Sequence, residues 1–169
     1  IKKKIKISQL KLSKKNNFYK FIKKNWVKNI NLSLTRKVFD WQHKSNKKYN
    51  FCIAKDNKKI IGVQGFMPMS HFDSALSKSS LFQVFLRVVD GKYIGTAVLL
   101  HQKIISLCDS KFIGVVGIDK ITHRFHRWLG FKVFKMEHHF ILSEKIKIFK
   151  LIKKGNKKFR QKKINKKSD

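Results

Sequence analysis

Acidic residues are scarce in this 169-residue sequence: nine Asp and Glu stand against 41 Lys and Arg, a formal net charge of +32. Arginine is scarce too, with five residues, although it is the side chain best suited to bidentate contacts with bases and phosphates. Residues 1–24 hold ten Lys, and residues 144–169 hold eleven Lys and one Arg. Long like-charge runs are usually solvated tails. We therefore do not expect nucleic acid as the primary ligand, although both ends attract anionic surfaces.

Cysteine and long apolar runs are also rare. Cys52 and Cys108 are too few and too far apart for a disulfide framework or a metal knuckle, and their apolar neighbours indicate buried free thiols. No apolar run approaches the ~20 residues of a membrane span, and the N-terminal residues lack the apolar core of a signal peptide. His138 and His139 would point to opposite faces of a strand, so they do not chelate together. We expect a cytoplasmic protein without a metal.

Apolar residues make up 42% of the chain, and its 15 Phe supply bulky core material. These numbers predict one globular domain, which we place at residues 1–143, followed by a basic extension at residues 144–169. In the extension, residues 145–152 mix Lys with apolar side chains. They form either an amphipathic segment that contacts anionic membrane or a partner, or else an extra strand or helix leading to a further domain, or a solvated tail. The charge run favours the last two interpretations over the amphipathic segment.

The pattern of apolar residues predicts a mixed α/β domain. Strands are expected at residues 5–12, 49–54, 60–67, 81–89, 111–118 and 131–143. Helices are expected after Ser13 as the N-cap, with Phe18, Phe21, Ile22 and Trp26 on the apolar face, then at residues 34–41, after Gly95, and at residues 122–129. In the second of these helices, Val38, Phe39 and Trp41 are expected near the core. The strand at 111–118 is nearly all apolar, which is typical of a central strand buried on both faces.

Three turns are indicated by residues that favour turn conformations. Asp56-Asn57 marks a hairpin turn between two strands, and Gly130 is placed to end a helix. The turn that holds Gly91 and Gly95 stops an apolar strand and opens a helix. Such a turn offers unpaired backbone N–H groups at the positive end of a helix dipole, so it predicts a site for a phosphate or pyrophosphate.

This order of elements, with its glycine turn, resembles the Gcn5-related N-acetyltransferase (GNAT) superfamily. The family's pyrophosphate loop, Arg/Gln-x-x-Gly-x-Gly/Ala, is matched by Lys92-Tyr-Ile-Gly95-Thr-Ala97. The longer form, Arg-Gly-x-Gly-x-Gly, aligns with residues 90–95, where Asp90 and Tyr93 replace Arg and Gly. Trp128-Leu-Gly-Phe131 is similar to the family's Leu-Gly-Phe ending. Its Gly130 lies 35 residues after Gly95.

The resemblance covers roughly residues 3–142. Details such as Phe39-Asp-Trp-Gln-His43, Ile60-Ile-Gly62 and the segment 66–73 look like a bacterial subgroup associated with surface-polysaccharide and amino-sugar biosynthesis. The resemblance implies an acyl-CoA N-acyltransferase fold with a mixed, largely antiparallel, splayed sheet. It also implies transfer of acetyl from acetyl-CoA to a small amine such as an amino sugar. The alternative is an inactive protein of this fold that binds nucleic acid or anionic surfaces through its basic ends.

By this resemblance, backbone groups hold the acyl donor. Residues near Val88 pair with the pantetheine amides, and one N–H there faces the thioester oxygen. The pyrophosphate lies on backbone N–H groups of Gly91, Lys92, Tyr93, Ile94, Gly95 and Thr96.

Side chains are needed for the proton transfers. His126 stands where the family often has a Tyr that protonates the leaving thiolate, although its spacing from His123 favours an exposed polar helix face. His71 and then Asp73 are candidate bases for the amine, with a water chain as the alternative. Gln83 and Arg87 alternate with Phe85 on one strand, which predicts a polar strand face that contacts the acceptor.

Overall fold

The computed structural model describes residues 5–25, 36–89 and 93–135. The chain divides into two compact units, residues 1–119 and 120–169, and each is described by itself below. The division falls at Asp119, inside the stretch that the sequence predicted to be one domain. The predicted boundary at residue 143 lies outside the described residues.

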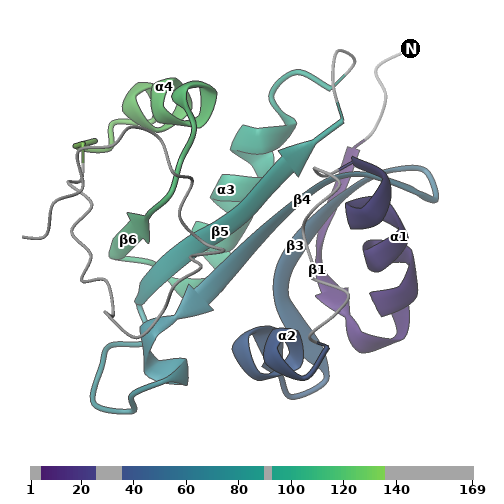
Figure 1. Ribbon diagram of the computed structural model, residues 1–169, viewed down its shortest axis with the longest axis horizontal. Coiled ribbons are helices and arrows are strands. Elements are labelled where there is room, and N and C mark those ends of the chain that lie inside the picture. Colours follow the sequence, from purple (N-terminus) through teal and green to yellow (C-terminus); the bar gives the residue numbers. More distant parts are fainter. Residues whose placement is uncertain (1–4, 26–35, 90–92, 136–169) are drawn as a thin grey trace, which may run out of the picture. The chain divides into compact units, whose positions relative to one another are not determined.

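The first unit is built on a six-stranded sheet whose order is β1-β3-β4-β5-β6, with the short β2 paired to β3 (Figure 1). The strands are β1 (Ile5–Lys11), β2 (Lys44–Ser45), β3 (Lys48–Asp56), β4 (Lys59–Pro68), β5 (Ser80–Val88) and β6 (Phe112–Val115). The helices are η1 (Leu12–Lys14), α1 (Lys15–Asn25), α2 (Arg36–His43), η3 (Met69–His71) and α3 (Thr96–Cys108). All pairings are antiparallel except β5 with β6, which α3 joins as a crossover helix.

The β3–β4 hairpin forms where its turn residues predict it. Asp56 pairs with Lys59, so the loop holds two residues. Asn57 has a φ of 53°, a left-handed conformation that asparagine tolerates better than most residues. The hairpin prediction is therefore confirmed.

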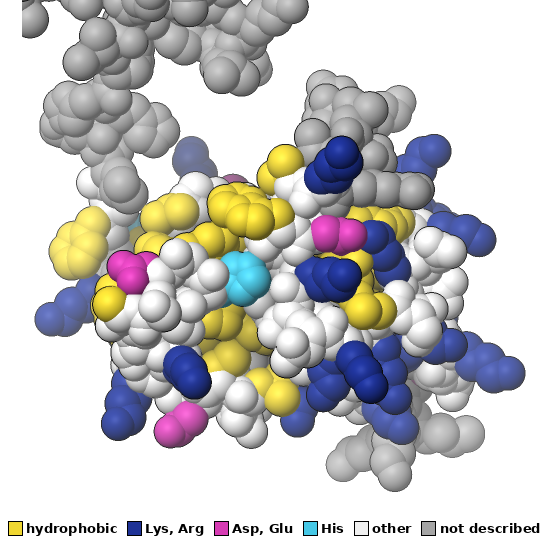
Figure 2. Space-filling view, turned by 90° about the horizontal axis from the view of Figure 1, so that it is seen from below, with side chains coloured by type: hydrophobic (Ala, Val, Ile, Leu, Met, Phe, Trp, Pro, Cys, Tyr) yellow, Lys and Arg dark blue, Asp and Glu magenta, His cyan; other side chains and the backbone are white. Residues whose placement is uncertain are grey.

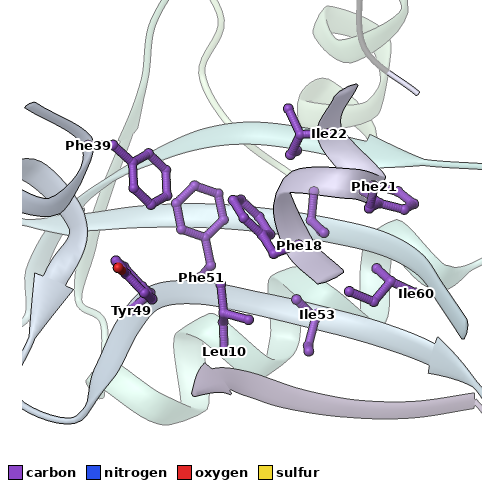
Figure 3. Packing of buried hydrophobic residues seen from close by; sticks show 10 residues of the cluster. Leu10, Phe18, Phe21, Ile22, Phe39, Tyr49, Phe51, Ile53 and Ile60 are labelled. Atoms are coloured by element: carbon purple, nitrogen blue, oxygen red, sulfur yellow. The ribbon is translucent and has the colours of Figure 1, made fainter. Parts of the chain in front are cut away.

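Two hydrophobic clusters cover the two faces of the sheet because strand side chains alternate. In β3, Phe51 and Ile53 belong to one cluster, whereas Cys52 and Ala54 belong to the other. Helices α1 and α2 cover the first cluster (Figure 3), and α3 covers the second. The first cluster contains Leu10, Phe18, Phe21, Ile22, Phe39, Tyr49, Phe51, Ile53, Ile60 and Val63. Cys52 is a buried free thiol, as predicted, and burial raises its pKa to about 12.

The first two helices differ in detail from their predictions. Helix α1 buries Phe18, Phe21 and Ile22 as expected, but Ser13 lies within the preceding 3-10 turn and is not its N-cap. In α2, only Phe39 of the three predicted core residues is buried. Trp41 is 63% exposed, because α2 turns one side toward the sheet and the apolar pattern of so short a helix does not fix which side.

The predictions for the last two strands are corrected. Strand β6 has four residues and is the last strand of the sheet in the described part of the chain, and its Phe112 is 56% exposed. The apolar run thus predicted a strand correctly but not its burial on both faces. Residues 131–135 form no strand, since no neighbouring strand pairs with them among the described residues, and Phe134 is 78% exposed. The rest of the predicted strand, residues 136–143, lies outside the described residues.

The second unit contains α4 (Lys120–Trp128), which ends as predicted at Gly130. Gly130 has a φ of 88°, and its N–H donates to the carbonyl of Arg127. The N–H of Phe131 donates to the carbonyl of His126. These two bonds form a Schellman motif, which requires a left-handed residue and therefore favours glycine.

A partly exposed ion pair links α1, α2 and β3. Lys15 Nζ lies 2.9 Å from Asp40 Oδ1, and the Tyr49 hydroxyl donates to the same oxygen at 2.7 Å. Burial alone raises the pKa of the Asp40 carboxyl, but the hydrogen bonds from Lys15 and Tyr49 outweigh it and lower the pKa below 3.8. Burial likewise opposes protonation of Lys15, yet its hydrogen bonds to Tyr49 and Asp40 raise its pKa above 10.5.

We predict that Lys15→Gln lowers the free energy of unfolding by about 1 kcal/mol or less at pH 7, because a partly exposed pair is screened by water. The lowered pKa of Asp40 means that the pair stabilises the fold above about pH 4 and that this effect fades as the pH falls further. The raised pKa of Lys15 means that the effect persists up to at least about pH 10. Urea unfolding at pH 7 and pH 3 measures the difference. The neighbouring exposed Lys14→Gln is the control, and an equal loss in both variants contradicts the prediction.

Candidate functional site

Strands β5 and β6 separate along their length and leave part of β5 with an open edge. They pair from Ser80 opposite Phe112 to Gln83 opposite Val115, whereas β5 continues to Val88. The Val89 N–H donates to the Ile61 carbonyl on β4 at 2.8 Å, and the preceding residue Val88 pairs with Gly62. In an antiparallel pair the groups of the adjacent residue point the other way. The N–H and C=O of Val88 therefore point to the open edge, where no described strand lies.

A β-bulge interrupts β5 in the middle of this region. Val84 pairs with Gly65 and Arg87 with Val63, so three steps on β5 oppose two on β4. Phe85 has a φ of 52°, which is uncommon for a bulky residue. A bulge of this kind bends the strand and re-aims the backbone groups beside it, and bulges are frequent next to active sites.

The bulge overturns the prediction that Gln83 and Arg87 share one strand face. Gln83 pairs with Phe66 and Arg87 with Val63, and these partners belong to the two different core clusters. Gln83 thus faces α3, whereas Arg87 faces the side of α1 and α2. The extra residue at the bulge shifts the alternation by one, and no glycine marks it in the sequence.

The side-chain amide of Gln83 is also hydrogen-bonded to other core residues. Gln64 Nε2 donates to Gln83 Oε1 at 3.0 Å, and Gln83 Nε2 donates to His101 Nδ1 at 2.8 Å. All three side chains are at most 4% exposed. They join β4, β5 and α3 through hydrogen bonds that a buried polar group requires. Gln83 therefore supports the structure beneath the open edge, and its contact with an acceptor stays a prediction.

The predicted phosphate-binding turn lies at the start of α3. The Thr96 N–H donates to the Tyr93 carbonyl at 3.2 Å, and Gly95 has φ 81° and ψ −10°. These values define a type II turn with glycine at its third position, where a left-handed conformation is needed. Because the turn uses the N–H of Thr96, the free N–H groups at the helix start are those of Ala97 and Val98. Asp90, Gly91 and Lys92 lie outside the described residues.

Tyr93 anchors this turn to the β3–β4 hairpin. Its hydroxyl donates to Asp56 Oδ2 at 3.0 Å, and this hydrogen bond raises the pKa of Tyr93. Tyr93 is one of the two departures from the family's loop, so here it has a structural task of its own. The neighbouring Ile94 is 96% exposed and makes no comparable contribution to the core.

A glycine on β4 lets α3 begin close to the open edge. A Cβ atom at Gly62 would meet Leu100 Cδ1 and Val88 Cγ2 at 3.2 Å and Thr96 Cγ2 at 3.3 Å. Gly62 is paired with Val88, so the first turn of α3 packs at the C-terminal end of β5. The open strand edge and the helix N-terminus are thus adjacent.

The two candidate bases lie in and after η3, at the other end of β4. His71 Nε2 is 2.8 Å from the Trp41 carbonyl, which can only accept, so Nε2 carries the proton and Nδ1 is the acceptor in the neutral ring. Asp73 Oδ1 accepts the Ala75 N–H at 2.9 Å and so forms an Asx turn. Both residues are exposed. This geometry favours His71 over Asp73 as a base.

An exposed aromatic pair lies beside His71. The rings of Trp41 and Phe72 meet edge to face with centroids 5.3 Å apart, and they are 63% and 48% exposed. Phe72 also contacts the His71 ring at 4.9 Å. Figure 2, which looks toward the end where α2 and η3 lie, shows hydrophobic side chains exposed around a histidine.

His43 is a titratable residue that the sequence did not single out as a base. It is 1% exposed and contacts the rings of Phe39, Phe51 and the bulge residue Phe85. Burial lowers its pKa to about 4, although a hydrogen bond to the Phe66 backbone opposes the shift. The ring is therefore neutral at pH 7 and a poor proton acceptor compared with an exposed imidazole. Its burial distinguishes His43 from an exposed histidine, and the neighbouring residues in the sequence do not predict that burial.

His126 lies in the second unit and is buried, not on an exposed helix face. It is 2% exposed, and its ring contacts Phe125 and Phe131 edge to face. Nδ1 lies 2.8 Å from the Thr122 carbonyl and must donate to it, so Nε2 is unprotonated in the neutral ring. Nε2 is buried without a hydrogen-bond partner among the described residues. Only the charged form of His126 could donate a proton from Nε2.

Within residues 5–25, 36–89 and 93–135, no group of three or more His, Cys, Asp and Glu is placed to hold a metal ion. In the same part of the chain, no helix has both the length and the apolar character needed to cross a membrane.

Solved structures share this fold, although no protein-family model and no curated protein sequence matches the chain. An aminoglycoside acetyltransferase from an uncultured soil metagenomic sample has a TM-score of 0.61 at 16% identity, over 83% of this chain and 99% of the other. Aminoglycoside N-acetyltransferase AAC(6')-Iy in complex with CoA has a TM-score of 0.58 at 14% identity, over 85% and 96%. A GNAT-family acetyltransferase from Streptococcus pneumoniae has a TM-score of 0.54 at 12% identity, over 83% and 99%. The chain therefore has the GNAT fold, and the predicted fold class is confirmed.

We predict that Gly95→Ala lowers the free energy of unfolding by about 1 kcal/mol, because a Cβ disfavours the left-handed conformation. Nothing lies within 4 Å of such a Cβ, so the loss comes from the backbone alone. Gly95→Asn is the matched control and should lose less, since asparagine tolerates this region. Urea unfolding measures both, and equal losses would argue against the type II turn.

Proposed function

We propose that this protein is an acyl-CoA-dependent N-acyltransferase that transfers acetyl from acetyl-CoA to a small amine, in the cytoplasm. One observation carries the proposal: the open edge of β5 ends at the N-terminus of α3. An extended amide chain can pair with a strand edge, and a diphosphate can lie at a helix start. Acetyl-CoA carries both groups in sequence. The likeness to a structure in complex with CoA supports the same assignment.

In this proposal the backbone holds the acyl donor. The outward N–H and C=O of Val88 pair with a pantetheine amide, as expected from the sequence. We assign the pyrophosphate to the turn from Tyr93 to Thr96, together with the N–H groups of Ala97 and Val98. Tyr93 contributes by keeping the turn attached to Asp56. Backbone donors do not depend on side-chain identity, which explains how this loop tolerates Tyr93 where the family has glycine.

The amine nitrogen attacks the thioester carbonyl carbon, the carbon–sulfur bond breaks, and the amine proton goes to a base. We assign the stabilisation of the oxyanion that forms on the carbonyl oxygen to a backbone N–H on the open edge near Val88, as the resemblance implies. His71 Nδ1 is our candidate for the base, ahead of Asp73. Protonation of the thiolate is assigned either to His126 in its charged form or to water, since a thiol of pKa about 8.5 leaves readily.

For the acceptor, we propose a small amine such as an amino sugar. The exposed rings of Trp41 and Phe72 offer an apolar surface to a sugar ring beside His71. Two of the similar structures are aminoglycoside acetyltransferases. A net charge of +32 repels polycations, so we favour an acceptor with few amino groups over an aminoglycoside.

We predict that acetyl-CoA raises the free energy of unfolding by about 1.4 kcal/mol for each tenfold increase above its dissociation constant. Thermal unfolding of the full chain over a range of acetyl-CoA concentrations measures the effect. Tyr93→Phe should weaken it several-fold by loosening the turn, with little change in kcat. No shift in the melting temperature at millimolar acetyl-CoA would refute the acyltransferase proposal.

We predict that His71→Gln lowers kcat/KM for the amine about 100-fold at pH 7 and leaves the affinity for acetyl-CoA unchanged. Glutamine can still donate to the Trp41 carbonyl, so the loop should keep its conformation while the base is lost. Asp73→Asn, which preserves the Asx turn, is the control and should have a smaller effect.

The same assay tests whether the remaining candidate, His126, protonates the thiolate. His126→Phe should lower kcat without changing acetyl-CoA affinity if His126 is the acid. If His71→Gln has full activity at pH 7, the base assignment is wrong, whereas full activity of His126→Phe assigns thiolate protonation to water.

A further inference from the structure

A second concave site lies on the face of the sheet that α1 covers, opposite the face that α3 covers. It is a pocket of about 360 Å³ between α1, the β3–β4 hairpin and the end of β5. Its floor is apolar: Phe21 and Ile60 are buried members of the first core cluster, and Val89 packs against that cluster. The volume lies within the range of small-molecule sites, about 300–1,000 Å³. A ligand bound here can therefore make apolar contacts with the floor of the pocket.

The rim of this pocket is cationic. Lys20 and Lys24 approach it from α1, one turn apart, and Lys58 and Lys59 approach it from the hairpin. No carboxylate lines it among the described residues. The nearest acidic residue along the hairpin, Asp56, accepts the Tyr93 hydroxyl instead.

This lining selects the charge and the chemistry of a ligand. Each Lys offers three N–H donors and no acceptor, and Asn17 and Asn25 add amide groups at the rim. Four like charges around one cavity repel each other, and a bound anion relieves that repulsion. A phosphate monoester carries a charge near −2 at pH 7 and several acceptor oxygens, so it matches several lysines better than a carboxylate does. The apolar floor requires a planar or apolar body on that phosphate.

We propose that this pocket binds a small phosphate ester with a planar or apolar body, at a site separate from that of the acyl donor. The phosphate lies among Lys20, Lys24, Lys58 and Lys59, and the body lies on Phe21, Ile60 and Val89. The two sites are on opposite faces of the sheet, since α1 covers one cluster and α3 the other. Asp56 and Lys58 belong to the same hairpin, so a ligand here also contacts the element that anchors Tyr93.

The test is a calorimetric titration of the full chain with adenosine 5′-monophosphate and, separately, with inorganic phosphate. Salt of about 0.15 M screens diffuse attraction to the lysine-rich surface. We expect the monophosphate to bind at least about tenfold more tightly than inorganic phosphate, because only the ester contacts the apolar floor. Equal affinities for the two probes would overturn the proposal.

Paired variants separate a built site from general charge. Lys20→Gln/Lys58→Gln removes two rim cations, whereas Lys14→Gln/Lys47→Gln removes two exposed lysines outside the pocket. The pocket variant should lose at least about tenfold in affinity for the monophosphate and the control less than about twofold. Equal losses of affinity in the two variants would show that the monophosphate is attracted to the lysine-rich surface in general, and would overturn the proposed site. Urea unfolding checks that both variants are folded.

A competition experiment distinguishes this site from the acyl-donor site. Adenosine 5′-monophosphate should bind with unchanged affinity when acetyl-CoA is saturating, and the pocket variant should keep the acetyl-CoA thermal shift. Displacement of the monophosphate by acetyl-CoA, together with loss of that shift in the pocket variant, would overturn the proposal of a separate site. If wild type binds the monophosphate but not acetyl-CoA, the pocket stands and the acyltransferase proposal fails.

Discussion

The two edges of β5 face different demands, and the candidate site depends on how they are met. On one edge the backbone must stay paired with β4, because buried N–H and C=O groups need partners. The bulge at Phe85 interrupts this pairing, which resumes at Arg87 and continues to the hydrogen bond between the Val89 N–H and the Ile61 carbonyl. On the other edge β6 pairs only as far as Gln83. The second half of β5 is therefore held from one side, while the N–H and C=O of Val88 point to the other side, where none of the described strands lies.

Two groups of polar side chains inside the first unit hold this arrangement. Gln64, Gln83 and His101 join two strands to α3 below the point where β5 leaves β6. Leaving such groups unpaired in a core costs about 1–3 kcal/mol each, so the network resists any shift of α3 along the sheet. Lys15, Asp40 and Tyr49 have the same effect on the other face, where they connect α1 and α2 to β3. The two faces thus have separate internal supports.

Local chemistry in the sequence predicts some of these features well. Asn57, Gly95 and Gly130 all adopt left-handed conformations, and the sequence signals each of them because few other residues fit there. Phe85 adopts one as well, but no local signal marks a bulky residue in that conformation. The register of β5 and the faces of Gln83 and Arg87 therefore could not be deduced. The burial of His43 and the exposure of Trp41 depend on packing between elements, which a pattern of apolar residues does not specify.

The bond between Tyr93 and Asp56 makes the donor loop dependent on strand alignment. Asp56 is the last residue of β3, and its side chain reaches Tyr93 only because the β3–β4 ladder ends opposite Lys59. A slip of one residue in that ladder would turn Asp56 to the opposite face of the sheet. The length of the hairpin therefore sets the position of the turn that opens α3. A chain with one residue inserted or deleted in the hairpin could keep its fold and its loop sequence and still misplace that turn.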